Sequence, residues 1–218
     1  MDGLAIAASL GEMRPAVEGG FVRTVYQPTR DVVILRVSGA RKSRILISPR
    51  DASIHLTALE VENPRRPSAF AMLLRSHLRG GRVVAVRQTG WDRIVTFDVE
   101  RSTGGKRQTV QLVAELVGPR GNVMLVRDGA IVGALRRSSR AAPGCPYSPL
   151  RPQEKRDPAA LECAEVEEWL HASDPARALT QNVDGVGRRT AEDVLRAVNP
   201  GERTAPPAEH VCALFAYL

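Results

Sequence analysis

Lysine, aromatic residues and cysteine are all scarce in this chain of 218 residues. Only 4% of the residues are aromatic, so the core must be built mainly from Val, Leu, Ile and Ala. The 3 cysteines lie too far apart for a zinc knuckle and do not indicate a disulfide framework. No apolar run approaches the ~20 residues that a membrane helix needs. The first residues lack the basic segment and cleavage site of a secretory signal, so we expect a cytoplasmic protein with no membrane partner.

The positive charge comes almost entirely from arginine and is concentrated in one part of the chain. There are 28 arginines and 3 lysines, and the net charge is +7. Residues 1–156 carry 26 basic and 13 acidic side chains, whereas residues 157–218 carry 5 basic and 11 acidic ones. Arginine forms forked hydrogen bonds to phosphate and stacks on bases. A thermophilic or GC-rich host would also raise the arginine content. The segregation predicts that a polyanion binds the first part of the chain.

The spacing of apolar residues in the first part predicts an α+β fold. Helices are expected over 2–17 and 68–79, the second ended by a glycine cap at Gly80-Gly81. One N-terminal helix, one internal helix and about eight strands indicate a curved sandwich or a barrel-like sheet. The strands are expected at 21–27, 32–37, 45–48, 82–89, 93–101, 108–116, 122–127 and 131–135.

The second part is predicted to be a small helical domain. Residues 141–152 contain four prolines, so we expect a domain at 1–140, a linker at 141–158 and a domain at 159–218. Helices are expected over 162–171, over 175–179 and from 209 onward. The chain stops inside the last helix, which predicts a fragment of a longer protein.

Residues 183–195 have the pattern of a helix-hairpin-helix. The glycines of Gly185-Val186-Gly187 let two helices approach and leave backbone amides free to hold a phosphate oxygen. Arg188 and Arg189 follow directly and could contact the nucleic-acid backbone. A purely structural hairpin is the alternative, because the surrounding region is acidic.

Asp92-Arg93 follows a tight turn in the most basic stretch of the chain. Between residues 63 and 93 there are seven arginines and a single acid. A carboxylate on such a surface can accept from a base amino group or hold an arginine fork in place. The alternative is an ordinary turn residue whose ion pair contributes ~0–1 kcal/mol.

Other polar residues have structural interpretations. Asp2 fits the cap of the first helix. Glu115 alternates with Gln111 and Thr109 on what we expect to be a solvated strand face, and His77 fits a hydrogen-bonded core position. No histidine has partners at metal-ligand spacing, and no phosphate loop, dinucleotide fingerprint or nucleophile elbow occurs. We therefore expect no metal, no cofactor and no small-molecule substrate.

A series of motifs along essentially all 218 residues resembles the NFACT family. They are Met1-Asp2-Gly3, Tyr26-Gln27-Pro28, Leu46-Ile47-Ser48, Asn63-Pro64, Phe70-x-Met72-Leu73-Leu74-Arg75-x-His77-Leu78-x-Gly80-Gly81, Gln88-x-Gly90-x-Asp92-Arg93-Ile94-Val95, Glu115-Leu116-x-Gly118 with Asn122, and Pro143-Gly144-x-Pro146-Tyr147-x-Pro149.

The resemblance implies a first domain similar to the N-terminal domain of formamidopyrimidine-DNA glycosylases, followed by a helix-hairpin-helix domain. It also implies a ribosome quality-control factor. Such a factor binds the large ribosomal subunit, through its rRNA, when a peptidyl-tRNA blocks it, and recruits tRNA. Bacterial members use alanyl-tRNA to add C-terminal tails to stalled chains. The ribosome transfers the peptide, so this protein would not itself be an enzyme.

The family's motifs, carried over to this chain, imply a set of tRNA-facing residues. Two departures from the family pattern bear on them. Fewer residues precede Asp2 than is usual in the family. Ser76 stands where the family usually has a lysine, and this difference removes one phosphate contact. The implied residues are Asp2, Asp92, Arg93 and Glu115, with Asn122 and Arg75 as further candidates.

Two other functions remain open. A DNA glycosylase or lyase would need an N-terminal proline amine or a hairpin lysine as nucleophile. This chain begins Met1-Asp2-Gly3 and has no lysine after Lys155. A surface adhesin that binds fibronectin, as an older family label suggests, would need an export signal, which the sequence does not show.

Overall fold

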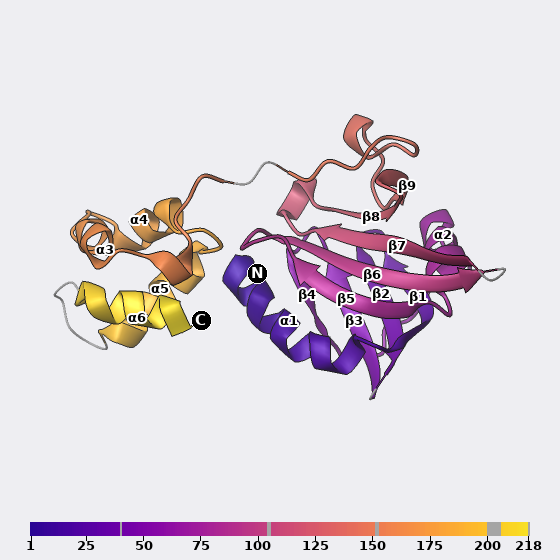
Figure 1. Ribbon diagram of the computed structural model, residues 1–218, viewed down its shortest axis with the longest axis horizontal. Helices are drawn as coiled ribbons and strands as arrows, with labels where there is room; N and C mark the ends of the chain where they lie inside the picture. Colours follow the sequence, from indigo (N-terminus) through magenta and orange to yellow (C-terminus); the bar gives the residue numbers. More distant parts are fainter. Residues whose placement is uncertain (40, 104–105, 151–152, 200–205, 218) are drawn as a thin grey trace. The chain divides into compact units, whose positions relative to one another are not determined.

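A computed structural model describes residues 1–39, 41–103, 106–150, 153–199 and 206–217. It is an α+β protein with a large antiparallel sheet and flanking helices (Figure 1). Two compact units can be distinguished. The β-rich unit comprises residues 6–89 and 93–150, and the helical unit comprises residues 1–5, 90–92 and 151–218. The predicted boundaries were 140 and 158, whereas the units divide between residues 150 and 151, and the short segments 1–5 and 90–92 belong with the helical residues.

The strands of the β-rich unit form one sheet in the order β4-β3-β2-β1-β5-β6-β7-β8-β9. Two antiparallel meanders, β1 to β4 and β5 to β9, are joined where Phe21 pairs with Arg82. The strands are β1 (Phe21–Thr29), β2 (Val32–Ser38), β3 (Lys42–Ser48), β4 (Ser53–Leu56), β5 (Arg82–Gln88), β6 (Ile94–Thr103), β7 (Lys106–Glu115), β8 (Asn122–Arg127) and β9 (Ala130–Ala134).

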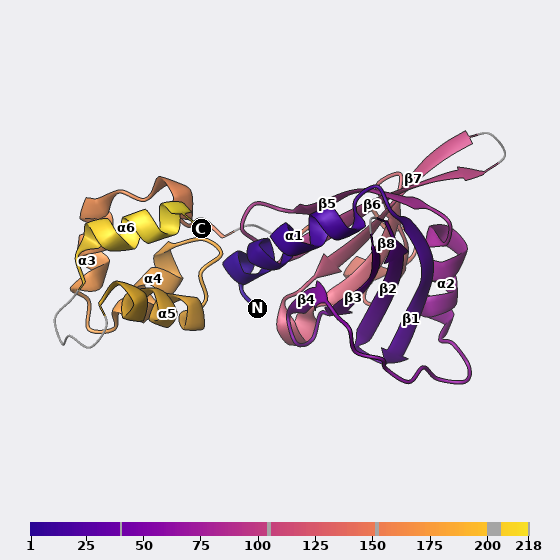
Figure 2. The ribbon, with the colours of Figure 1, turned by 90° about the horizontal axis from the view of Figure 1, so that it is seen from below.

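The core of the β-rich unit lies between this sheet and two helices, α1 (Gly3–Val17) and α2 (Ala69–Leu78). Ile6, Leu10 and Met13 of α1 are completely buried. Figures 1 and 2 show α1 running along the curved sheet, and α2 packs against β1 and β9. In β6 every second residue, namely Val95, Phe97 and Val99, enters this core.

The predicted bounds of α2 are confirmed at both ends. The Ser68 hydroxyl accepts from the Ala71 amide at 3.0 Å, which caps the first turn. At the other end Gly80 has a φ of +78°, the left-handed conformation that glycine adopts without strain.

Two parts of the β-rich unit differ from the prediction. β4 was not predicted, and β3 begins at Lys42 rather than at Ile45. Both segments mix polar and apolar residues, and β3 and β4 form only by pairing with each other and with β2. Tertiary pairing thus overrides a weak local signal.

The predicted linker also differs from the structure, because its first half packs on the sheet. Ile131 donates to the Cys145 carbonyl at 2.8 Å, and Tyr147 donates to the Gly129 carbonyl at 2.8 Å. A second apolar cluster on β6 to β9 is closed by Tyr147 and Leu150. Prolines do not prevent this docking, since few backbone donors are needed beside an edge strand.

The helical unit contains the four helices α3 (Cys163–Leu170), α4 (Pro175–Asn182), α5 (Arg188–Val198) and α6 (Ala208–Tyr217) among its described residues. Its core includes Val166, Leu179, Val183 and Phe215, and Trp91 packs against it. Short 3-10 turns occur in both units. They are η1 (Gly118–Arg120) and η2 (Ser139–Ala141) in the β-rich unit and η3 (Pro158–Ala160) in the helical unit.

Across the parts of the chain that the structure describes, no helix has the length and apolar character needed to cross a membrane.

Candidate nucleic-acid interface

Three of the predicted site residues meet at adjacent strand ends in the β-rich unit. Ile94, the first residue of β6, pairs with Glu115 at the end of β7, and Glu115 pairs with Asn122 at the start of β8. Arg93 immediately precedes β6, and its carbonyl accepts from the Leu116 amide at 2.7 Å. The antiparallel register therefore brings Arg93, Glu115 and Asn122 together, although they are far apart in sequence.

Glu115 is completely buried, which contradicts the predicted solvated position. Its carboxylate forms an ion pair with Arg140, and the Tyr147 hydroxyl donates to its Oε1 at 3.3 Å. Arg140 is the last residue of the predicted first domain, and Tyr147 comes from the segment that was predicted to be a linker. The charge is tolerated in the interior because it is paired and hydrogen-bonded there.

Asn122 is also buried and uses its amide to join β8 to the residue that follows β9. Its Oδ1 accepts from the amides of Val123 and Arg136 at 2.9 Å each, and its Nδ2 donates to the Arg136 carbonyl at 2.8 Å. These three bonds use most of the hydrogen-bonding capacity of an asparagine side chain. Asn122 therefore organises this end of the sheet.

Arg136, which Asn122 holds, continues the network toward the surface. Its guanidinium donates to the carbonyls of Pro119 and Gly121 at 2.8 and 3.0 Å, and to Asp31 at 2.7 Å. The Arg136 hydrogen bond lowers the pKa of the Asp31 carboxyl below its usual value, and Arg50 adds to the effect.

Arg75 fixes α2 against β1 rather than standing free. Its Nε donates to the Val25 carbonyl at 2.6 Å, and its guanidinium lies 5.4 Å from the centre of the Tyr26 ring. Beside it, Ser68 hydrogen-bonds Gln27. Two motifs of the family resemblance, one on β1 and one on α2, are thus in direct contact.

The remaining predicted residues belong to the helical unit, and here two carboxylates occupy the hairpin amides. Asp2 caps α1 by accepting from the Ala5 amide at 3.0 Å, and its second oxygen accepts from the Gly187 amide at 2.7 Å. The Gly185 amide donates to Asp184 at 2.8 Å. The expectation that these glycine amides are free for a phosphate is therefore not met.

The two arginines after the turn differ in their surroundings. Arg188 pairs with Asp174 at 3.0 Å and with Glu192 at 2.8 Å, and the hydrogen bond to Asp174 raises its pKa. Arg189 is almost fully exposed and lies 3.9 Å from Asp193. Arg189 is therefore the more exposed and the less closely paired of the two.

Asp92 and Arg93, neighbours in sequence, fall in different units. Asp92 ends the short segment 90–92, whose Trp91 donates from its indole to Asp157 at 2.9 Å. Within the described ranges, no group of three or more His, Cys, Asp or Glu residues could hold a metal ion.

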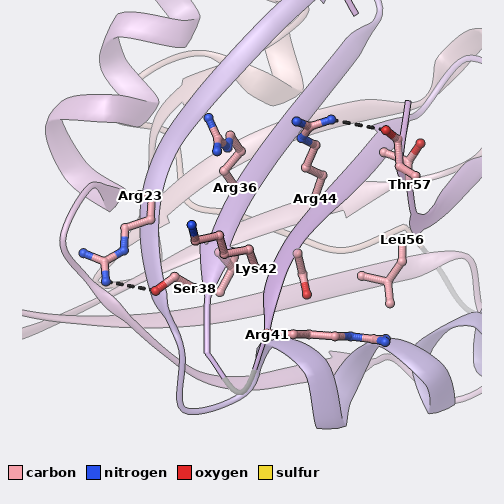
Figure 3. A pocket seen from close by; sticks show the side chains of 11 residues that line it. Arg23, Arg36, Ser38, Arg41, Lys42, Arg44, Leu56 and Thr57 are labelled. Atoms are coloured by element: carbon pink, nitrogen blue, oxygen red, sulfur yellow. Dashed lines mark hydrogen bonds between the residues drawn. The ribbon is translucent and has the colours of Figure 1, made fainter. Parts of the chain in front are cut away.

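Sequence reasoning missed a basic pocket of about 720 Å³ on the first meander (Figure 3). Arg23, Arg36, Lys42 and Arg44 come from β1, β2 and β3, and Arg41 from the turn before β3. The sequence pattern that could have revealed this pocket is the pair of cations at positions 42 and 44, which lie opposite residues 38 and 36 of the preceding strand.

A family model described as the NFACT N-terminal and middle domains matches residues 2–211. The Rqc2 homolog RqcH of Bacillus subtilis is 30% identical over 233 residues, which cover 99% of this chain and 40% of the relative. The ribosome quality control complex subunit NEMF of Homo sapiens is 32% identical over 120 residues, which cover 55% of this chain and 11% of that protein. The chain thus spans about two fifths of the length of the bacterial relative.

Solved structures share the fold. The N-terminal part of the fibronectin/fibrinogen-binding protein from Streptococcus suis superposes with a TM-score of 0.83 at 25% identity, covering 99% of this chain and 84% of that one. The N-terminal domain of the fibronectin-binding protein PavA from Streptococcus pneumoniae gives 0.79 at 27% identity, covering 90% of this chain and 83% of that one.

Proposed function

This chain belongs to the NFACT family, and from that premise we propose that it is the RNA-binding part of a ribosome quality-control factor. In this proposal it binds the obstructed large ribosomal subunit and recruits tRNA, in bacteria alanyl-tRNA, so that tails are added to stalled chains. The names of the bacterial and human relatives support it. The observation that carries it is the convergence of Arg93, Glu115 and Asn122 within a strongly basic unit.

We propose different tasks for these residues, and their burial and contacts support the division. The Glu115 carboxylate is buried and paired, so it positions the Arg140 guanidinium instead of reading a nucleobase. Asn122 positions Arg136 in the same way. Arginines present forked donors to phosphate and can stack on unpaired bases. We propose that Arg93 and Arg140 face the RNA, and that Glu115 and Asn122 hold the site in shape.

The proposed protein is not an enzyme and needs no cofactor, because the ribosome performs the peptide transfer. Residues 183–195 would serve as a helix-hairpin-helix that joins α4 to α5 and packs on Asp2. A cytoplasmic location follows from the ribosomal partner.

Binding of labelled tRNA at several salt concentrations tests this function. We expect a steep fall in affinity with salt, since bound arginines displace counterions from phosphates. Arg93→Ala should weaken binding by about 1–3 kcal/mol, whereas Arg107→Ala on the β6–β7 hairpin should not. Equal affinity at low and high salt, or an unaltered Arg93→Ala variant, would contradict the proposal. Sequencing of RNA that co-purifies with the chain should show enrichment of alanine tRNA.

Binding of fibronectin is a second candidate, which the names of the two streptococcal neighbours favour. It predicts saturable binding of the chain to immobilised fibronectin that the Arg93→Ala variant retains. If no such binding were detected at micromolar concentrations of the chain, fibronectin binding would be excluded as a function.

A further inference from the structure

The pocket on the first meander is strongly cationic. Its lining combines five basic residues with Val37, Leu56 and Ala58, and none of its described lining residues is acidic. Figure 3 shows Arg23, Arg36, Lys42 and Arg44 gathered over neighbouring strands. Its volume of about 720 Å³ falls within the range of about 300–1,000 Å³ typical of ligand sites.

The strand register places two arginines opposite each other there. Arg36 of β2 lies directly opposite Arg44 of β3, and Ser38 lies opposite Lys42. Like charges facing each other across two strands destabilise a sheet. Glu60, whose pKa is lowered by Arg44 and Arg36, offsets part of this repulsion. The other cations of the pocket remain to attract a bound anion.

Some of these cations are positioned and others are available. Arg44 is held by the carbonyls of Ala58 and Leu59 at 3.2 Å each and by Glu60 at 2.6 Å. Among the described residues, the exposed side chains of Arg36 and Lys42 make no hydrogen bond and no salt bridge, although the charge of Arg36 helps to lower the pKa of Glu60. The Ser43 hydroxyl, which lines the same pocket, is buried and lacks a hydrogen-bond partner within the described structure.

An adjoining hollow adds an aromatic surface. A second pocket of about 210 Å³ shares Arg36 and Arg44 with the first and is lined by Tyr26, by Asn63 and by one acidic residue, Glu60, which pairs with Arg44. A basic path beside an aromatic ring is the combination by which proteins bind single-stranded nucleic acid, since the cations follow the phosphates and the ring stacks on a base.

We propose that these two hollows form a binding groove for single-stranded RNA, in which Arg23, Arg36 and Lys42 contact consecutive phosphates and Tyr26 stacks on a base. This groove is separate from the strand ends at Arg93. It rests on the proposed function in so far as the natural ligand is then an unpaired segment of tRNA or rRNA.

The test compares two double variants of the whole chain that remove the same charge. Arg36→Gln/Lys42→Gln alters the groove, and Arg107→Gln/Arg120→Gln alters exposed arginines at the β6–β7 hairpin and in η1. The probe is fluorescein-labelled decauridylate, with a duplex RNA of the same length as comparison, measured by anisotropy from 50 to 300 mM salt. Circular dichroism melts of all variants check that the fold is kept.

We expect the groove variant to bind decauridylate roughly tenfold more weakly at 100 mM salt. The slope of log affinity against log salt should fall by about 1.4, because two single-strand phosphate contacts are lost. The control variant should stay within about twofold of the wild-type chain, and the duplex should bind more weakly than decauridylate.

Each contrary result has a distinct meaning. Unchanged decauridylate affinity in the groove variant, or an equal loss in the control variant, would overturn the groove while leaving tRNA binding through Arg93 intact. Equal competition by polyglutamate would identify a site for acidic proteins and overturn the RNA assignment. If the wild-type chain bound neither decauridylate nor tRNA, the groove and the proposed function would both fail.

Discussion

The buried polar residues of the site are structural before they are functional. Glu115 is inaccessible to solvent, whereas the side chain of its partner Arg140 is 39% exposed. Such a pair holds one guanidinium in place at the surface while the carboxylate remains inside. Removal of one member of a buried pair is costly, because the other charge stays in the interior without compensation.

Arg140→Ala should therefore lower the free energy of unfolding by about 3 kcal/mol. The double variant Arg140→Ala/Glu115→Gln should recover much of that loss, since a neutral amide can still accept from Tyr147. Urea unfolding followed by circular dichroism measures both. If the double variant were as unstable as Arg140→Ala, the buried charge would not be the cause.

Asp2 gives a second prediction for a single residue, because each of its oxygens has its own amide partner. Asp2→Ala should cost about 2 kcal/mol, whereas Asp2→Ser, which can still cap α1, should cost about 1 kcal/mol. Hydrogen exchange by NMR distinguishes the two bonds. The Gly187 amide should exchange faster in both variants, and the Ala5 amide only in Asp2→Ala. Slow exchange of Gly187 in Asp2→Ala would refute this assignment.

Between elements, the ion pair of Asp31 and Arg136 links the β1–β2 turn to the chain after β9. The two residues are 105 positions apart, and their side-chain atoms approach to 2.7 Å. Arg50 lies 3.3 Å from the other oxygen of Asp31. Through these two arginines one carboxylate connects two turns of the first meander with the chain after β9, a contact that no local pattern indicates.

The lowered pKa of Asp31 sets the direction of a pH effect. The folded state favours the charged form of the Asp31 carboxylate more than the unfolded chain does. The contribution of this carboxylate to the free energy of unfolding is therefore complete above the unfolded pKa near 3.8. It is lost as the pH falls through the lower, folded value. Asp31→Asn should therefore be less stable than the wild type at pH 6. Urea midpoints of the two proteins should converge toward pH 2, and a constant difference at all pH values would exclude this linkage.

In the molecule as a whole, the two units also differ in the sign of their charge. The acidic residues of 157–218 belong to the helical unit, and the arginine-rich strands form the β-rich unit. Within the helical unit, Arg188 is neutralised by Asp174 and Glu192. A polyanion is therefore attracted to one unit and repelled by most of the other.

Hydrogen exchange measured by mass spectrometry, with and without tRNA, tests this division. We expect slower exchange in peptides from β1 to β3 and around residues 93 and 140, and unchanged exchange in α3 to α6. The matched control is the same experiment at 500 mM salt, where screening should abolish the protection. Protection concentrated in α5 would instead support nucleic-acid contact by Arg188 and Arg189.

The sequence alone was sufficient for features that depend on neighbouring residues. Apolar periodicity located α1, α2 and most strands, and the Ser68 cap and Gly80 stop fixed the ends of α2, because caps and glycine conformations are local. The motif spacing also led to the family that the comparisons show. It could not reveal β4, whose pairing partner lies in β3.

Only the tertiary structure decided which polar groups are buried and what they bind. Alternation placed Glu115 on a solvated face, yet η2 and the segment that follows it cover that face and supply Arg140 and Tyr147. The Asp2 contact with Gly187 spans 185 positions. Burial and long-range hydrogen bonds depend on which segments meet, and that is a property of the folded chain rather than of any stretch within it.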